Sequence, residues 1–244
     1  MQQNVGYMRE NHQEKTPMYF IGLNNLASLL EQAGDTTKPL AMFTEVLRDA
    51  ESAATTADDP RLPTYRQNLG RSLMLNGRLD AARALLAMEI EGNLDTVNLN
   101  IERGRRLTRL AEWMRRSGRY DEALRYAEQA DAMFTSIYPN EHARHGAVAR
   151  TRGLILRDQH RLAEAQSELQ RAADILVRTA GKDANTTIET ELQLADVLAE
   201  LGRVDEARTL HERVAPSLAD RFVEHSLVRE QHAALGKRLA SSNS

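Results

Sequence analysis

Hydrophobic and polar positions along the chain follow a pattern that recurs five times. In each copy, an apolar stretch with helical spacing ends at a short turn and restarts as a second amphipathic stretch. Successive turns are 43, 41, 42 and 42 residues apart. One helix pair cannot bury its apolar stripe alone, whereas a stack of pairs can, so this period predicts a solenoid of stacked helix pairs. The turn residues are Gly34, Gly77, Gly118, His160 and Gly202.

Small residues recur on both helices of each predicted pair. The second helix of the third copy carries Ala123, Ala127 and Ala130 on one face, which lets a neighbouring helix approach closely. Glycine at the turn accepts a positive φ and ends a helix in a left-handed cap, and histidine is among the residues that tolerate this conformation. The pattern therefore predicts an all-α fold. The small residues of the five first helices are Ala27, Gly70, Ala111, Gly153 and Ala195.

These offsets together resemble the tetratricopeptide repeat. The copies at Leu110–Ala123 and Leu194–Ala207 show the pattern most clearly, and the segment Leu23–Leu30 is similar to the long-helix variant of kinesin light chains. The usual tetratricopeptide period is about 34 residues, and the longer period here resembles that of repeats in many bacterial signalling proteins. The resemblance implies an α-solenoid of five helix pairs in a right-handed superhelix with a C-terminal capping helix.

The boundaries of the predicted parts follow prolines and composition. Pro39 takes the place of a small residue in the first repeat, and it is acceptable only in the first turn of its helix, where no amide proton is needed. Pro216 is expected to precede a terminal helix with Val223, Leu227 and Leu235 on its apolar face. The predicted parts are a polar N-terminal segment at 1–17, five repeats at 18–216, a C-terminal capping helix at 217–240 and a disordered tail at 241–244.

Composition narrows the classes of function. The 244 residues carry a formal net charge of −3, which argues against generic nucleic-acid binding because duplex affinity needs an accumulated positive surface. The chain has no cysteine, which excludes disulfides and thiolate metal ligands. No stretch approaches the roughly 18 apolar residues of a membrane helix, and the polar N-terminus lacks the apolar segment of a secretory signal. We therefore expect a cytoplasmic protein.

Motifs for catalysis do not assemble in this sequence. It has no phosphate-binding glycine loop and no protein-kinase motif. The acidic pairs Asp121–Glu122 and Asp205–Glu206 recur at equivalent helix starts, which favours a helix-dipole role over a catalytic dyad. His142 and His145 are spaced to offer two nitrogens to a metal but lack a third ligand nearby, so we interpret them as solvated surface histidines. His211 is expected to be a packed imidazole. The sequence predicts no enzyme, no metal and no cofactor.

The resemblance also implies where a partner binds. The first helices of tetratricopeptide repeats line a concave groove, and the groove offsets select a set of polar residues here. Asparagines could bond the backbone of an extended peptide, and the arginines of repeats two to four could take carboxylates bidentately. We therefore expect an acidic or phosphorylated peptide as the partner. The candidate groove residues are Asn24, Asn25, Gln67, Asn68, Arg71, Met74, Arg105, Thr108, Arg115, Arg150 and Arg157, with acidic Glu189, Asp196 and Glu200 in the fifth repeat.

Other interpretations stay open. The arginines could equally be solvated charges on long helices. The chain could be the regulatory or sensor region of a larger bacterial signalling protein, with a Ser/Thr kinase domain or a winged-helix transcriptional regulator upstream. An enzyme in its own right is disfavoured, because function must be argued from a site and none assembles. Self-association is also possible, since Leu75, Leu154 or Met74 beside the groove could accept a second copy.

Overall fold

The chain is all-α, as the hydrophobic pattern predicts. The computed structural model describes residues 2–11, 13, 15–54, 59–91 and 99–241, and these ranges contain twelve helices and no strand. Among these residues, no helix combines the length and the apolar character needed to cross a bilayer. The helices are grouped in two compact units, unit 1 (Met1–Gly92) and unit 2 (Asn93–Ser244).

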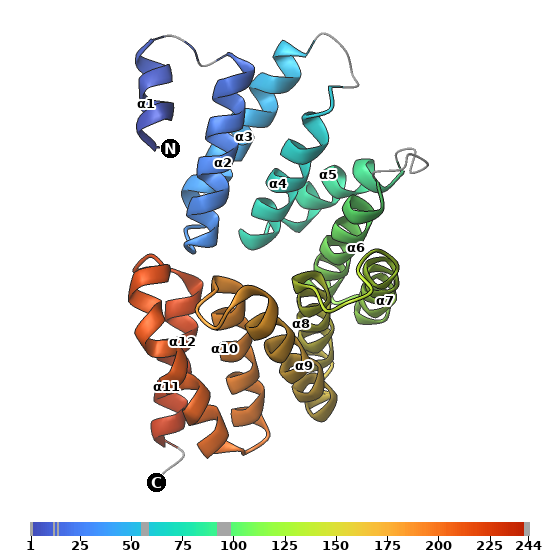
Figure 1. Cartoon of the computed structure of the whole chain (residues 1–244), viewed down its shortest axis with the longest axis vertical. Helices are drawn as coiled ribbons and strands as arrows, with labels where there is room; N and C mark the ends of the chain where they lie inside the picture. The colour runs from blue at the N-terminus through green and yellow to red at the C-terminus, as the bar shows by residue number, and fades with distance from the viewer. Residues whose placement is uncertain (1, 12, 14, 55–58, 92–98, 242–244) are drawn as a thin grey trace. The chain divides into compact units, whose positions relative to one another are not determined.

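Unit 1 holds the first two predicted repeats. Its helices are α1 (Gln2–Glu10), α2 (Pro17–Gln32), α3 (Thr37–Ala53), α4 (Leu62–Leu75) and α5 (Leu79–Glu91). Consecutive helices pack against each other, so that α2/α3 and α4/α5 form two stacked pairs (Figure 1). Phe20, Leu23 and Phe43 lie in the core between them, each no more than 2% exposed. Pro39 is buried in the first turn of α3, which confirms the position expected for it.

Unit 2 holds the other three repeats and the C-terminal helix. Its helices are α6 (Leu99–Arg116), α7 (Tyr120–Ile137), α8 (Ala143–Asp158), α9 (Leu162–Ala180), α10 (Asn185–Glu200), α11 (Val204–Arg221) and α12 (Leu227–Ser241). The pairs are α6/α7, α8/α9 and α10/α11, and α12 packs against both α10 and α11 (Figure 1). The first helices of successive pairs, α6, α8 and α10, also contact one another. This arrangement places their polar faces in one row.

The turn inside every pair has the same backbone geometry. Gly34, Gly77, Gly118 and Gly202 have φ values of 85°, 71°, 74° and 76°. In each turn the next residue donates its N–H to a carbonyl five residues earlier, for example Arg119 to Met114 at 2.9 Å. This is the Schellman arrangement, which satisfies carbonyls at the end of the first helix. The predicted left-handed caps are therefore confirmed.

His160 adopts the same left-handed conformation, with φ 58°, and is the one non-glycine with positive φ among the described residues. An L-residue in this conformation is strained by its Cβ, so we expect His160→Gly to stabilise unit 2 by about 1 kcal/mol. Thermal unfolding followed by the fluorescence of Trp113 measures this change, because Trp113 is the single tryptophan and lies on α6. A lower melting temperature of His160→Gly would contradict the prediction.

The predicted small residues lie where helices approach most closely. Ala27, Ala111 and Ala195 are fully buried. An ideal Cβ built at Gly153 would lie 2.7 Å from Cγ of Leu169 and 3.2 Å from the Leu169 backbone nitrogen. Only a residue without a side chain therefore lets α8 and α9 meet at this distance.

The N-terminal segment contains a helix that its polar composition does not suggest. α1 packs on α2 through Val5, which is 5% exposed and contacts Gly22. Its Arg9 donates to the Tyr19 hydroxyl at 2.8 Å, and that hydroxyl donates to Glu45 at 2.6 Å. Arg9 also forms an ion pair with Glu45 at 3.1 Å. These contacts attach α1 to both helices of the first repeat.

The C-terminal helix differs from the predicted one. Residues 217–221 complete α11, so Pro216 lies inside a helix rather than before the closing segment. Residues 222–226 are not helical and separate α11 from α12. α12 then runs to Ser241, the first residue of the expected tail, and residues 242–244 lie outside the described residues. The predicted apolar face is wrong in part. Leu235 is buried, but Val223 and Leu227 are 39% and 50% exposed, because Val228 and Leu239 share the buried face instead.

Two histidines attach α12 to α11. The rings of His211 and His232 stack with centroids 3.7 Å apart and planes 8° from parallel. Nε2 of each ring lies about 3 Å from the other's backbone carbonyl, at 3.1 Å and 3.0 Å. Burial is the main cause that lowers the pKa of His232 below its usual value. His211 is packed, as expected, although it is half-buried rather than in the core.

Candidate functional site

The groove candidates of unit 1 lie on the facing helices α2 and α4. Nδ2 of Asn68 donates to Oδ1 of Asn24 at 2.9 Å. Arg71 forms an ion pair with Glu31, whose side chain is only 2% exposed. Asn25 is exposed beside these pairs. The structure therefore brings together the polar residues predicted in the first two repeats, but it uses most of them to join α2 to α4.

Two of the candidates in unit 1 cannot contact a partner. Met74 is 2% exposed and Gln67 is 3% exposed, so both are core residues of α4 and not groove residues. The prediction failed because one turn of helix carries both the groove face and the packing face, and sequence offsets do not separate them. The suggestion that Met74 helps to accept a second copy is wrong for the same reason.

In unit 2, the predicted arginines and acids form one set of ion pairs between successive first helices. Arg115 on α6 pairs with Asp158 on α8. Arg150 pairs with Glu189 on α10 at 2.6 Å, and Arg157 pairs with Glu200 at 3.3 Å and Asp196 at 4.0 Å. Arg238 on α12 also pairs with Asp196. We call these eight residues the ion-pair ladder. It balances the acids of the fifth repeat against the arginines before them.

The most buried member of the ladder is Arg115, whose side chain is 14% exposed. It makes two 2.8 Å hydrogen bonds to Glu112 in addition to its pair with Asp158. Burial alone would raise the pKa of Glu112, but the hydrogen bonds and charge of Arg115 outweigh it and hold that pKa below its usual value. Burial of Asp196, in contrast, raises its pKa despite the charges of Arg238 and Arg157. The ladder is thus a set of partly desolvated charges.

The ladder is interrupted at one end of α6 and α8. Arg144 lies fourteen residues before Asp158, which is four turns along the same face of α8. Asp158 pairs with an arginine of α6, Arg115, whereas the α6 arginine whose charge acts on Arg144 is Arg105. Burial, and after it the charge of Arg105, lower the pKa of Arg144, against smaller opposing effects of Tyr138 and Glu102. Arg105 pairs with Glu102 on its own helix at 2.7 Å, whereas Arg144 forms no ion pair with a carboxylate among the described residues.

The remaining candidate, Thr108, donates its hydroxyl to the Gly104 carbonyl at 2.8 Å. Leu154 lies half-buried on α8 between Arg150 and Arg157. Neither adds a charge to the groove. At this end of α6 and α8, Arg144 therefore carries a positive charge with which no carboxylate of the described residues pairs.

The histidine pair before α8 is structural. Nδ1 of His142 accepts from the Arg144 N–H, and Nδ1 of His145 accepts from the His142 N–H, both at 3.2 Å. The two imidazoles thus act as a capping box for α8. His142 also stacks on Tyr138 with ring centroids 3.9 Å apart. Our interpretation of both as solvated surface residues is wrong for His145, which is 8% exposed.

Sequence reasoning missed Asp158, Arg238 and Arg144. A signal for the first two was available, because paired charges in the ladder lie about one repeat apart. Arg115 and Asp158 are 43 residues apart, and Asp196 and Arg238 are 42 apart. A search for opposite charges one period apart would have found these pairs. It would also have shown that Arg144 lies 39 residues after an arginine.

Stacked helix pairs with a common left-handed turn, and a row of polar first helices, define an α-helical repeat protein. Sequence profiles of the tetratricopeptide repeat match residues 104–142 and 144–218, which cover the repeats of unit 2. Residues 104–218 of the chain thus consist of tetratricopeptide repeats. Proteins with this repeat generally mediate protein–protein interaction. No curated protein sequence matches the chain.

Several solved structures share the fold. BtubC (BKLC) from P. vanneervenii is 19% identical with a TM-score of 0.59, over 90% of this chain and 88% of that one. A putative kinesin light chain from Podosopora anserina, with nearly identical TPR-like repeats, is 20% identical with a TM-score of 0.55, over 84% and 97%. A thermophilic TPR protein from Thermus thermophilus is 18% identical with a TM-score of 0.55, over 92% and 98%. The similarity to kinesin light chain-like repeats agrees with the long period.

Proposed function

We propose that the chain is a non-catalytic scaffold that binds an extended segment of a partner protein along the first helices of its repeats. The observation that carries this proposal is the interruption of the ion-pair ladder at Arg144 and Arg105. Elsewhere in the ladder each arginine is matched by a carboxylate of the chain itself. At this interruption the charge of Arg105 acts on Arg144 and helps to lower its pKa, and Arg105 itself pairs with Glu102 on its own helix.

An anionic group of the partner would complete this position. A carboxylate or a phosphate suits the Arg144 guanidinium, because charge-assisted bidentate hydrogen bonds satisfy both the charge and the donors of a guanidinium. A phosphate would carry up to about two negative charges there. The partner is thus an acidic or phosphorylated peptide segment, whose binding relieves the repulsion between Arg144 and Arg105.

The polar face of the first helices also supports binding rather than catalysis. Among the described residues, the carboxylates of the groove are engaged with arginines, and no group of three metal-ligating side chains comes together. Tetratricopeptide proteins are typically non-catalytic. We propose the same for this chain.

Capture of partners from a lysate of the source organism tests the proposal. Arg144→Glu places an acid on the face of α8 that carries Asp158 about four turns later, so the new glutamate can pair with Arg105 and extend the ladder. We expect this variant to keep its fold and to lose capture of the partner. Arg125→Glu is the matched control, because Arg125 is exposed on the outer helix α7 and undergoes the same change of charge. We expect the native chain and Arg125→Glu to retain the same partner.

Equal capture by Arg144→Glu would contradict the proposal. Treatment of the lysate with phosphatase before capture separates the two kinds of anion. Loss of the partner after treatment identifies a phosphorylated segment, and retention identifies an acidic one.

A further inference from the structure

The start of the second helix in each repeat carries a pair of opposite charges, with one exception. Arginine follows the turn in the last three repeats and binds the glutamate three residues later, as Arg119–Glu122, Arg161–Glu164 and Arg203–Glu206 at 2.5 to 2.6 Å. The first repeat has the reverse order, with Asp35 and Lys38 at 3.9 Å. We call a pair of opposite charges at the start of the second helix of a repeat the turn clasp.

The second repeat has half of the clasp. Its arginine is Arg78, but the residue three positions later is Ala81. The Arg78 backbone is fixed in the turn, where its N–H donates to the Leu73 carbonyl at 2.9 Å. Among the described residues, the Arg78 guanidinium takes part in no hydrogen bond and no ion pair. Arg78 thus has the position of a clasp arginine but lacks the carboxylate that pairs with the equivalent arginine in the last three repeats.

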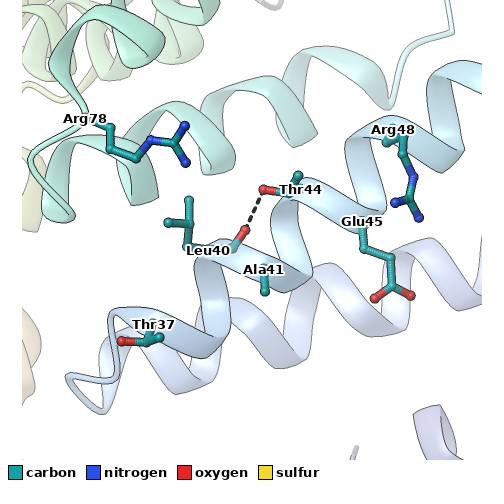
Figure 2. Close-up of a pocket in the computed structure, with 7 residues that line it drawn as sticks. All are labelled: Thr37, Leu40, Ala41, Thr44, Glu45, Arg48 and Arg78. Carbon is teal, nitrogen blue, oxygen red and sulfur yellow. Dashed lines mark hydrogen bonds between the residues drawn. The ribbon is translucent and has the colours of Figure 1, made fainter.

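Arg78 lines a depression on the outer surface of unit 1. The depression has a volume of about 490 Å³, and its other lining residues all lie on α3. Figure 2 shows the Arg78 side chain directed toward α3, with Leu40 pointing toward it. The position of the turn relative to α3 is fixed by Asn76, whose Nδ2 donates to the Thr36 carbonyl at 2.8 Å. The lining residues on α3 are Thr37, Leu40, Ala41, Thr44, Glu45 and Arg48.

The other charged groups at the depression already have partners. Glu45 accepts from Tyr19 at 2.6 Å and pairs with Arg9, and its carboxylate points away from Arg78 in Figure 2. Arg48 binds Asp49 through two hydrogen bonds of 2.6 Å and 3.1 Å. Thr44 donates to the Leu40 carbonyl at 2.7 Å. Arg78 is therefore the group that gives the depression an available charge, beside the apolar side chains of Leu40 and Ala41.

We propose that this depression binds an acidic segment of a partner protein, whose glutamate or aspartate carboxylate takes the place of the missing clasp residue on Arg78. The occupant is a carboxylate because a glutamate forms an ion pair with the equivalent arginine in three other repeats of this chain. Bidentate arginine–carboxylate geometry gives the contact its direction. An apolar side chain next to the acidic residue contacts Leu40 and Ala41. This surface lies on an outer helix and is distinct from the proposed groove on the first helices.

Installing the missing residue provides the test. Ala81 is exposed in the first turn of α5, so Ala81→Glu should fold normally and close the clasp on Arg78. An internal carboxylate is present at an effective concentration of roughly mM or more, which competes with a weakly bound peptide. Ala81→Gln is the matched control, because glutamine has nearly the same size without the charge.

The readout is the NMR signal of Arg78 Nε–H in the full chain, titrated with the peptide acetyl-Ala-Glu-Leu-Ala-amide. We expect a saturable shift for the native chain and for Ala81→Gln, and about two- to fivefold weaker binding for Ala81→Glu. The corresponding peptide with glutamine in place of glutamate should give no saturable shift. Three results would overturn the proposal: no saturation with the glutamate peptide, equal binding by Ala81→Glu, or saturation by inorganic phosphate alone.

Discussion

Replacement of Gly153 by valine is expected to lower the free energy of unfolding of unit 2 by about 3 kcal/mol. The added Cβ would lie 2.7 Å from Cγ of Leu169, which is fully buried and cannot move aside without disturbing α9. Overpacking of this kind outweighs the gain of a few tenths of a kcal/mol in helix propensity of valine over glycine. Urea unfolding followed by Trp113 fluorescence measures the loss.

A second substitution separates overpacking from other causes. Leu169→Ala alone should cost about 3 kcal/mol, because it leaves a cavity between α8 and α9. In the double variant the valine fills part of that cavity, so the combined loss should be smaller than the sum of the two by at least about 1 kcal/mol. Strictly additive losses would show that Gly153 is needed for a reason other than its contact with Leu169.

Replacement of Arg115 by methionine is expected to destabilise unit 2 by about 2 kcal/mol. Removal of one partner of a buried ion pair typically costs about 3–5 kcal/mol, and the partial exposure of this pair reduces that figure. Methionine keeps the length and the packing of the side chain but leaves the carboxylates of Glu112 and Asp158 without Arg115. Urea unfolding at neutral pH measures the change.

The effect of Arg115→Met on stability should also depend on pH. Arg115 helps to hold the pKa of Glu112 below its usual value in the folded chain, so this stabilisation is present above about pH 4.5 and is lost as the pH falls through the lower folded pKa. The native chain and Arg115→Met should therefore differ most at neutral pH and converge in acid. A constant difference at all pH values would assign the loss to packing instead.

A control for this prediction lies on the surface. Arg178 and Glu141 form an ion pair at 2.7 Å, but their side chains are 55% and 52% exposed. Surface pairs contribute about 1 kcal/mol or less, so Arg178→Met should change the stability little. A loss as large as that of Arg115→Met would mean that burial does not distinguish the two pairs.

The helix pairs could be predicted from the sequence because their signals are local and repeated. A left-handed residue at the turn and small residues at the helix contact are required by the backbone itself, whatever the neighbours are. His160 shows this well, since its place in the repeat is enough to predict its positive φ. The break before α12 was missed because it depends on which side of a terminal helix finds a neighbour.

The candidate site was less predictable, since it depends on how one helix lies on the next. Arginines and acids were recognised separately, but the matching of Arg150 to Glu189 requires the stacking of α8 on α10. Met74 illustrates the opposite error, because its offset is that of a groove residue and its side chain is buried. The interruption at Arg144 becomes visible only when the pairs around it are known.

The five turns inside the helix pairs are alike in backbone conformation and hydrogen bonding, whereas the two fully described connections between pairs, before α8 and before α10, differ from each other. His142 caps α8, while the N-cap residue of α10, Ala184, forms no side-chain cap. The backbone geometry within a pair is thus repeated closely, while the connections before α8 and α10 are built differently. In the history of such a gene, duplication or loss of whole helix pairs is the natural route to a longer or shorter array, with joins placed at the variable connections.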